Sequence, residues 1–324
     1  MPRIPPQVIN SVFYLYRTHA DAVAGKNPGG TGFLVHYDGY KGTIVRRGQV
    51  YAVTNWHVAC RGHSVIRVNT KNGGTDIFEF GPKDWYFLPG KYDVAVVPIS
   101  LKIETHNVAA IPTTLFSQPD RGVGQRAAVG DDVFMIGLFI DHDGITTNVP
   151  SARFGNISML PNPAATIEQE TGYRGESYVV DMHSRTGFSG SPVFVYRTFG
   201  SDLTTDNLEF DHLQIDQWEE RLRPNSRIGG AMTGRIHVET MFHFLGIHWG
   251  QFPEKWELHE KSYLEEASRK DLIVKGGYVE GMSGMTCVIP AWQILEVFEM
   301  KEVKAARDAF NVSSEQKGAK PKAQ

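Results

Sequence analysis

The chain has 324 residues, of which 41% are hydrophobic, and this is enough to bury one large core or two smaller ones. Its 33 basic and 36 acidic residues give a formal net charge of -3, with no concentrated basic block apart from a short lysine-bearing tail, which argues against nucleic acid as a main partner. No segment approaches about 18 uninterrupted apolar residues and the N-terminus shows no signal-peptide pattern, so we expect a cytoplasmic protein without a membrane partner.

Apolar and β-branched runs of strand length recur between Gly, Pro, Asn and Asp residues. The runs in the order of the chain are VFYLYR, GTGFLVHYDG, GQVYAVTNW, SVIRVN, DIFEF, DVAVVPI, DVFMIGLF, SARFGNISML, SYVVDM, PVFVY, FLGIHWG and MTCVIP. Many short strands with few helical patterns predict an all-β fold of antiparallel barrels or sandwiches. A segment rich in Pro, Ser and Gly separates two halves, so we expect a first β domain in residues 1–115, a linker at 116–130 and a second β domain at 131–305.

The second half also carries two insertions and a helix. Residues 197–245 separate two apolar strands by far more than the roughly 2 to 5 residues of a hairpin loop, so they form a long insertion. We expect another insertion at 251–275, which contains the charged, helix-like run PEKWELHEKSYLEEASRKDL. The run PAWQILEVFEMKEVKAARDAF has helical periodicity, with Pro290 suited to the first turn, and predicts a C-terminal helix packed on the second half. We expect residues 306–324 to be a disordered tail.

Three stretches together could supply an activated nucleophile: TNWHVA with His57, KYDVAVVPI with Asp93 and TGFSGSPVF with Ser189. A serine hydroxyl needs an imidazole to take its proton, and the imidazole needs a carboxylate to orient it and stabilise its charged form. His57 follows one strand and Asp93 opens another, so the core would hold both side chains. Gly187 and Gly190 allow a tight turn in which the amides of Gly187 and Ser189 form an oxyanion hole.

In this order the three motifs resemble those of the trypsin/chymotrypsin-fold serine peptidases, and the likeness covers most of residues 28–300. The segments GDDVFMIG, FGNIS and TCVIPA also resemble the second barrel of the bacterial members. The resemblance implies two antiparallel six-stranded β-barrels, with His57 and Asp93 on the first, Ser189 on the second and the active site between them. It implies a serine endopeptidase that acts on protein or peptide substrates through an acyl-enzyme and needs no cofactor.

The pair SGSPVF and GIHWG is similar to the bacterial glutamyl endopeptidases and exfoliative toxins. That resemblance implies that His248 and Ser184, five positions before Ser189, bind the side chain of an acidic P1 residue. His183 and Arg185 flank Ser184 and could add positive potential. We therefore expect cleavage after Glu, and less strongly after Asp. Those enzymes are secreted and several use a processed N-terminal amine, and this sequence shows neither feature.

Control of activity must differ from that of the digestive trypsin-like enzymes. In those enzymes an Asp before the nucleophile pairs with a newly cut N-terminus, whereas Phe188 holds that position here. The insertion at 197–245 is therefore the candidate for a lid or for the binding site of a regulatory partner. The chain could also be a latent enzyme, or a catalytically silent protein that uses this fold as a binding scaffold.

Several residues have simpler interpretations. Ser189 could be a turn residue, and His248 a hydrogen-bonded core histidine. Asp76 and Asp84 are rival carboxylates, but neither opens a strand like DVAVV. We expect ordinary surface or loop roles for His63, His106, His237 and His243. No HExxH pattern is present, and we expect no metal site.

The two cysteines, Cys60 and Cys287, exclude a disulfide framework. A single bridge could form, but two buried free thiols fit a cytoplasmic protein better.

Overall fold

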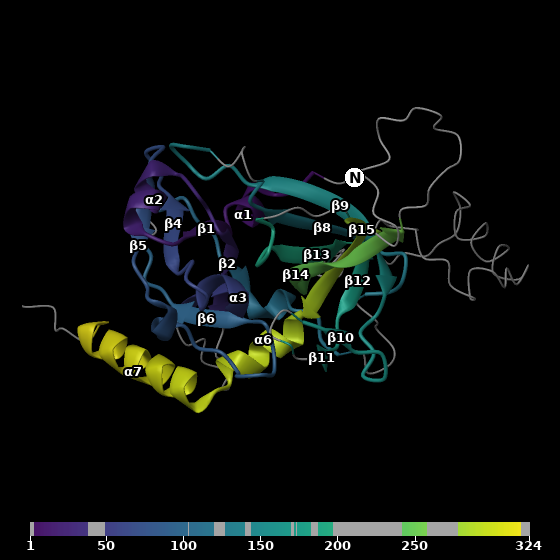
Figure 1. Cartoon of the computed structure of the whole chain (residues 1–324). Coiled ribbons are helices and arrows are strands. Elements are labelled where there is room, and N and C mark those ends of the chain that lie inside the picture. Colours follow the sequence, from purple (N-terminus) through teal and green to yellow (C-terminus); the bar gives the residue numbers. More distant parts are fainter. Residues whose placement is uncertain are drawn as a thin grey trace, which may run out of the picture.

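The computed structural model describes residues 3–37, 49–102, 104–119, 127–139, 144–169, 172, 174–182, 187–196, 242–257 and 278–318. These residues form two β units that lie side by side, with helices near the C-terminus running beneath them (Figure 1). The expected all-β architecture of two halves is confirmed.

The first unit is a curled sheet whose strands follow the order β5-β4-β1-β2-β3-β6, with the short β7 added in parallel to β2. Its strands are β1 (Val12–Tyr16), β2 (Gly30–Tyr37), β3 (Gln49–Thr54), β4 (Val65–Asn69), β5 (Thr75–Phe78), β6 (Ala95–Pro98) and β7 (Ile111–Pro112). The pairs along the main path are antiparallel. A six-stranded barrel was expected for this half, but in the described residues no pairing joins β5 to β6, so the sheet is curled rather than closed.

Short helices precede, connect or follow the strands of this first sheet. They are α1 (Pro6–Ile9), α2 (His19–Ala24), α3 (Trp56–Ala59) and the 3₁₀ turns η1 (Pro82–Asp84) and η2 (Thr113–Leu115). Helix α2 begins where the Thr18 hydroxyl accepts the Asp21 amide, and it ends at Gly25 in the left-handed region (φ 60°). Helix α3 follows β3 after a single residue, so the rigid strand fixes where that helix starts.

The second unit is a closed barrel of six antiparallel strands, as expected, in the order β12-β15-β14-β13-β8-β9. Its strands are β8 (Asp132–Gly137), β9 (Ser151–Met159), β12 (Tyr178–Asp181), β13 (Pro192–Tyr196), β14 (Phe242–Glu257) and β15 (Tyr278–Pro290). A two-stranded ribbon stands apart from the barrel and consists of β10 (Ile167–Glu168) and β11 (Arg174–Gly175).

One hydrophobic core runs through both units. Phe244 of β14 is fully buried, and its ring centroid lies 5.1 Å from that of Phe33 in β2 and 4.7 Å from that of Phe116. The Ser117 amide also donates to the Phe244 carbonyl at 2.9 Å. The segment expected as a linker therefore begins as a packed part of the interface, which fixes the two units relative to each other. Its residues 120–126 lie outside the described part of the chain.

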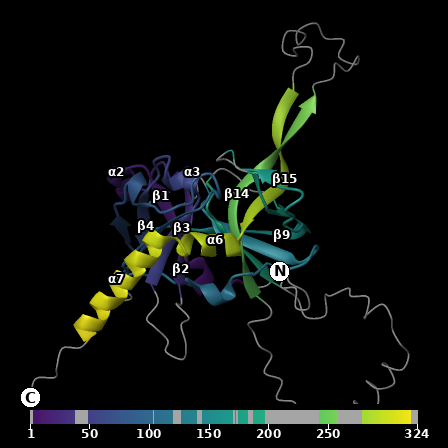
Figure 2. The same cartoon turned by 90° about the horizontal axis from the view of Figure 1, so that it is seen from below.

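Strands β14 and β15 continue past the barrel as a two-stranded arm (Figure 2). Their pairing extends from Gly246 opposite Pro290 to Glu257 opposite Tyr278, with register shifts at His248/Gly250 and Gln251/Pro253. Residues 251–257 are therefore strand, and the helix-like interpretation of this charged run is wrong there. The ladder with β15 pairs the backbone groups on one edge of this segment, and this tertiary pairing overrides a weak helical pattern. Residues 258–277 lie outside the described part.

Two helices follow β15: α6 (Ala291–Phe298) and α7 (Lys301–Gly318). The sequence placed the C-terminal helix on the second half alone. In the structure the Phe298 ring also packs against Tyr51 of β3, with centroids 4.8 Å apart, and Tyr92 donates to Glu296 at 2.9 Å. Helix α6 therefore spans both units, because the aromatic strands of the first sheet offer the apolar surface that Phe298 needs.

Helix α7 extends away from the body of the molecule (Figure 2). It runs to Gly318, so the tail expected from residue 306 onward is helical over most of its length, and residues 319–324 lie outside the described part. Its first turns contain Lys, Glu, Ala and Arg, which are good helix formers.

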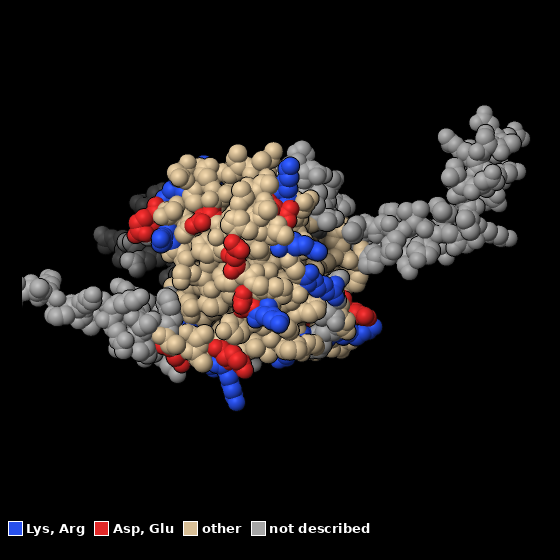
Figure 3. Space-filling model, turned by 60° about the vertical axis from the view of Figure 1, so that its left-hand side comes forward, with Lys and Arg blue, Asp and Glu red and all other residues tan. Residues whose placement is uncertain are grey.

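The long insertion cannot be placed, because residues 197–241 lie outside the described part of the chain. On the face drawn in Figure 3, basic and acidic residues alternate over a mostly uncharged surface, which matches the small net charge. None of the described helices has the length and apolar character needed to cross a membrane.

Candidate active site

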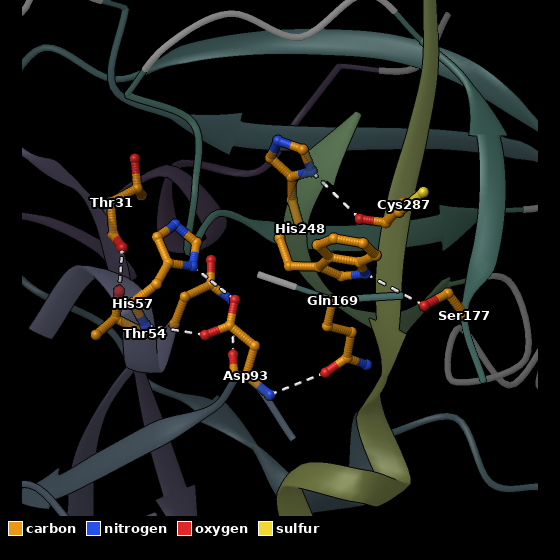
Figure 4. Close-up of polar contacts among 10 residues, drawn as sticks. Thr31, Thr54, His57, Asp93, Gln169, Ser177, His248 and Cys287 are labelled. Atoms are coloured by element: carbon orange, nitrogen blue, oxygen red, sulfur yellow. Dashed lines mark hydrogen bonds and ion pairs between the residues drawn. The ribbon is translucent and has the colours of Figure 1, made fainter. Parts of the chain in front are cut away.

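His57 and Asp93 lie together at the edge of the first unit (Figure 4). The Nδ1 atom of His57 lies 2.6 Å from Oδ2 of Asp93, and the His57 backbone amide donates to Oδ1 at 2.9 Å. Because a carboxylate only accepts hydrogen bonds, Nδ1 must carry the proton, and Nε2 is left as the basic nitrogen. Asp93 is fully buried, whereas the His57 side chain is 17% exposed. The pair therefore presents one basic nitrogen, Nε2 of His57, at the surface, and the buried Asp93 carboxylate fixes the orientation of the ring.

Two residues that the sequence did not single out hold the backbone of Asp93. Asn55 Nδ2 donates to the Asp93 carbonyl at 2.8 Å, and the Asp93 amide donates to Oε1 of Gln169 at 3.1 Å. Asn55 precedes helix α3, and Gln169 reaches across from the second unit, directly after β10. Both are buried. Asn55 stands beside a motif residue and could have been considered, whereas Gln169 lies in a loop without any motif.

The loop around Ser189 has the geometry that its glycines predict. Gly187 and Gly190 have φ values of 95° and 87°, in the left-handed region that favours glycine. The turn is closed by the Ser191 amide, which donates to the Phe188 carbonyl at 2.9 Å, and the Gly190 amide donates to the His248 carbonyl at the same distance. In the described part of the chain, neither the Gly187 nor the Ser189 amide donates to a backbone carbonyl.

The Ser189 loop lies against the segment that carries His57. The Thr31 amide of β2 donates to the Ser189 carbonyl at 2.9 Å. A Cβ atom on Gly30 would lie 3.2 Å from that carbonyl oxygen and 2.8 Å from Cγ1 of Val58, the neighbour of His57. The two units thus bring Ser189 and His57 to the same part of their interface. Among the described contacts the Ser189 hydroxyl makes no hydrogen bond with His57, and such bonds are often long without substrate.

The rival carboxylates have other partners. Asp76 Oδ2 lies 3.0 Å from Nε2 of His106, and Asp84 Oδ2 accepts the Gly81 amide at 2.6 Å. His106 also accepts the Lys102 amide at 2.8 Å. Asp93 is therefore the carboxylate that serves His57.

His106 and His243 were expected to be ordinary surface or loop residues. His106 does lie in a connection between strands but is buried, whereas His243 lies in β14 and is buried, so the expectation is wrong for His243. Their exposed fractions are 3% and 6%. His106 is buried because Asp76 and a backbone amide satisfy both of its ring nitrogens, while His243 lies within β14 opposite Val195. His63 is half-buried, and His237 lies outside the described part of the chain.

His248 lies on β14 beside the Ser189 loop and is only 2% exposed. Burial, opposed by the Cys287 carbonyl and reinforced by His57, lowers its pKa to about 4. Its Nδ1 lies 3.3 Å from the Cys287 carbonyl oxygen, which can only accept, so the neutral ring carries its proton on Nδ1. His183 and Ser184, the other residues expected in the P1 pocket, lie outside the described part, as does Arg185.

The two cysteines are free, as expected. Cys287 is buried and Cys60 is half-buried at the end of helix α3. Burial raises the pKa of each thiol to about 12, and for Cys60 the Asp93 carboxylate adds to the shift. Both therefore remain protonated thiols, which are poor nucleophiles.

Metal-ligating side chains do not gather anywhere in the described ranges, since no group of three or more His, Cys, Asp or Glu residues there could hold an ion.

Comparison with known proteins identifies a family. Residues 30–198, just over half of the chain, match the family model described as the trypsin-like peptidase domain. The crystal structure of Deg5 is 19% identical, covering 58% of this chain and 75% of its own, with a TM-score of 0.37. The active form of the Rv3671c protease from M. tuberculosis is 13% identical, covering 92% and 91%, with a TM-score of 0.41. No curated protein matches the sequence.

Proposed function

The chain belongs to the trypsin-like peptidase domain family, and on that premise we propose that it is a serine endopeptidase with Ser189 as nucleophile, His57 as base and Asp93 as the residue that orients His57. The observation that carries the proposal is the hydrogen bond from His57 Nδ1 to Asp93, because it fixes the tautomer that a general base requires; the bond from the His57 backbone amide holds the carboxylate in place. The placement of the Ser189 loop beside Val58 supports the assignment of the nucleophile.

In the proposed first step His57 Nε2 takes the proton from the Ser189 hydroxyl as the serine oxygen forms a bond to the scissile carbonyl carbon. The carbonyl π electrons move to its oxygen, which becomes negative. The amides of Gly187 and Ser189 are suited to bind that oxygen, since both are uncommitted in the described part of the chain. Asp93 stabilises the imidazolium that forms.

The tetrahedral intermediate then collapses. The carbon–nitrogen bond breaks, and His57 returns its proton to the leaving amine, which gives a free amino end and an ester at Ser189. Water attacks this ester with His57 again as base, so the products are a carboxylic acid and the original enzyme. These steps require no cofactor. A cysteine nucleophile is the weaker alternative, because the thiols of Cys60 and Cys287 stay protonated.

Cleavage after acidic P1 residues is part of the proposal and rests on the GIHWG motif and the position of His248. Neutral His248 has its proton on Nδ1, facing the Cys287 carbonyl, so Nε2 would meet a P1 carboxylate as an acceptor. Binding of a Glu side chain there requires a second proton on the ring, which the substrate charge itself would favour. The acidic preference should therefore strengthen as the pH falls.

A fluorophosphonate probe tests the nucleophile directly. The wild-type protein should be labelled, and Ser189→Ala should abolish labelling. Ser191→Ala is the matched control, because the Ser191 hydroxyl is fully buried two residues away and has no partner in the described residues. A folded wild-type protein that resists the probe would instead support the silent scaffold or the latent enzyme. Latency would be recognised if labelling appeared after proteolytic cutting within residues 197–245.

A second experiment tests the specificity. Cleavage of a peptide library should show Glu before the scissile bond. The ratio of kcat/KM for Glu to that for Gln at P1 should rise as the pH falls, although kcat/KM itself falls when His57 becomes protonated, and His248→Ala should lose the preference. A wild-type preference for apolar or basic P1 residues would refute the acidic assignment and leave the serine mechanism intact.

A further inference from the structure

Thr31 is bonded to the Ser189 loop by both its backbone amide and its side-chain hydroxyl. It lies at the start of β2 and is fully buried. Its amide donates to the Ser189 carbonyl at 2.9 Å, and its hydroxyl donates to the Gly187 carbonyl at 2.8 Å. The same hydroxyl oxygen accepts the Leu138 amide at 2.9 Å. One residue of the first unit is thus bonded to both sides of the Ser189 peptide.

These bonds determine which way the loop amides face. The carbonyls of Gly187, Phe188 and Ser189 all have donors, two of them supplied by Thr31 and one by Ser191. With three successive carbonyls held, the peptide planes around Ser189 cannot rotate freely. The uncommitted amides of Gly187 and Ser189 are then presented without any rearrangement at the moment of reaction.

Thr31 is connected in turn to the segment that carries His57 (Figure 4). The hydroxyl of Thr54, the last residue of β3, donates to the Thr31 carbonyl at 2.6 Å. His57 follows three residues later, and Thr54 is fully buried. A continuous path of hydrogen bonds therefore runs from the strand before His57, through Thr31, to the carbonyl of Ser189. It spans the interface between the two units.

We propose that Thr31 is a positioning residue, whose hydroxyl fixes the Ser189 loop relative to His57 across this interface. The inference rests on the proposed function. A hydroxyl is needed because the site demands one donor, to the Gly187 carbonyl, and one acceptor, for the Leu138 amide. Valine has nearly the shape of threonine but leaves both backbone groups buried without a partner. Serine keeps the hydroxyl and loses only a methyl group.

The test compares Thr31→Val and Thr31→Ser with the wild-type full chain. A fluorophosphonate reports kinact, the rate of acylation, separately from KI, the affinity of the encounter complex. We expect Thr31→Val to lower kinact by about 10- to 100-fold with KI nearly unchanged, because misplacement of a reacting group by about 1 Å costs rates of that order. Thr31→Ser should retain a rate near that of the wild type.

Hydrogen exchange of the peptide covering residues 187–191 gives a readout that needs no reaction. Exchange there should be at least about 10-fold faster in Thr31→Val and unchanged in Thr31→Ser. Ser11→Ala is the matched control, since the buried Ser11 hydroxyl donates to the Val8 carbonyl at 2.7 Å, away from this loop. It should alter neither measurement.

The proposal is overturned if Thr31→Val acylates and exchanges like the wild type, or if Thr31→Ser is as impaired as Thr31→Val. Failure of the proposed function is distinct, because it appears as a wild-type protein that the probe does not label. In that event the exchange data still decide whether Thr31 holds the loop: faster exchange in Thr31→Val supports the inference, and unchanged exchange refutes it.

Discussion

His57 is bound to Asp93 by two hydrogen bonds, one from its ring and one from its own backbone amide, at 2.6 and 2.9 Å. The arrangement makes the carboxylate part of the start of helix α3, so the orientation of the imidazole is coupled to the backbone that carries it. A side chain held in this way is locked into a single tautomer and a single ring orientation before substrate arrives.

Replacing that carboxylate with an amide tests whether the tautomer matters. Asp93→Asn should keep the fold but present an NH₂ donor to His57, which favours the tautomer with Nδ1 unprotonated. We expect kcat/KM for a peptide substrate to fall by roughly 10⁴-fold. Circular dichroism and thermal melting should show a folded protein. A fall of less than about 10-fold would mean that Asp93 does not orient the catalytic base.

The pH dependence of stability should report His248. Its pKa lies near 4 in the folded protein and near 6.5 in the unfolded chain, so the unfolded chain binds more protons between these values. Stability must therefore fall as the pH decreases from about 6.5 to 4, by about 3 kcal/mol from this residue. Above pH 6.5 the ring is neutral in both states and contributes no pH dependence.

Urea unfolding of wild type and His248→Gln at pH 7 and pH 4 measures this contribution. Glutamine stays uncharged, so the variant should lose about 3 kcal/mol less than the wild type over the same interval. Taking the difference between the two proteins removes the carboxyl groups that titrate in the same range. Equal losses in both proteins would show that burial does not keep His248 neutral.

The sequence predicted those features that depend on local patterns. Strand-length apolar runs gave the two β units, and His57 and Asp93 could be proposed because each adjoins such a run. The loop of Ser189 could be proposed because glycines with positive φ leave a signature in the sequence. These inferences succeed because the local preference agrees with the global fold.

Other features could not be predicted because they depend on which distant segments meet. Gln169 bonds to Asp93 across 76 positions, and Thr31 bonds to Gly187 across 156. The strand at 251–257 could not be predicted from its charged, helix-like composition, because it is formed by pairing with a partner strand that begins only at Tyr278. Arg67, in an ordinary strand pattern, gave no sign that it would be fully buried.

Arg67 should be among the largest single contributions to stability. Its guanidinium donates to Asn148 Oδ1 at 2.7 Å and to the Gly144 carbonyl at 3.0 Å, and it lies 4.9 Å from the centre of the Tyr16 ring. Arg67→Met would leave the buried Asn148 oxygen and the partly buried Gly144 carbonyl without these donors. We expect a loss of about 3 kcal/mol or more in the free energy of unfolding.

Chemical denaturation measures this loss, with Arg174→Met as the control. Arg174 is 69% exposed and pairs with Glu168 at 3.4 Å, so its replacement should cost less than about 1 kcal/mol. If the two variants were equally stable, the contacts of Arg67 would not stabilise the fold.

Alanine substitutions at Gly190 and Gly73 distinguish the free-energy cost of a positive φ from the cost of a steric clash. Their φ values are 87° and 83°, so an alanine at either position meets the same backbone strain of about 1 kcal/mol. A Cβ at Gly190 would lie 2.0 Å from the Thr31 carbonyl oxygen and 2.5 Å from Thr54 Oγ1, whereas a Cβ at Gly73 has no atom within 4 Å. Gly190→Ala must therefore disturb the hydrogen bond from the Thr54 hydroxyl to the Thr31 carbonyl, beside the Ser189 loop.

We expect Gly73→Ala to lower the free energy of unfolding by about 1 kcal/mol and to keep full activity. Gly190→Ala should lower it by about 3 kcal/mol and reduce acylation of Ser189 by at least about 100-fold. Urea unfolding and probe labelling measure the two quantities on the same samples. If Gly190→Ala were acylated as fast as Gly73→Ala, the contact of this loop with Thr31 and Thr54 would not control the nucleophile, because a methyl group placed there cannot leave that contact intact.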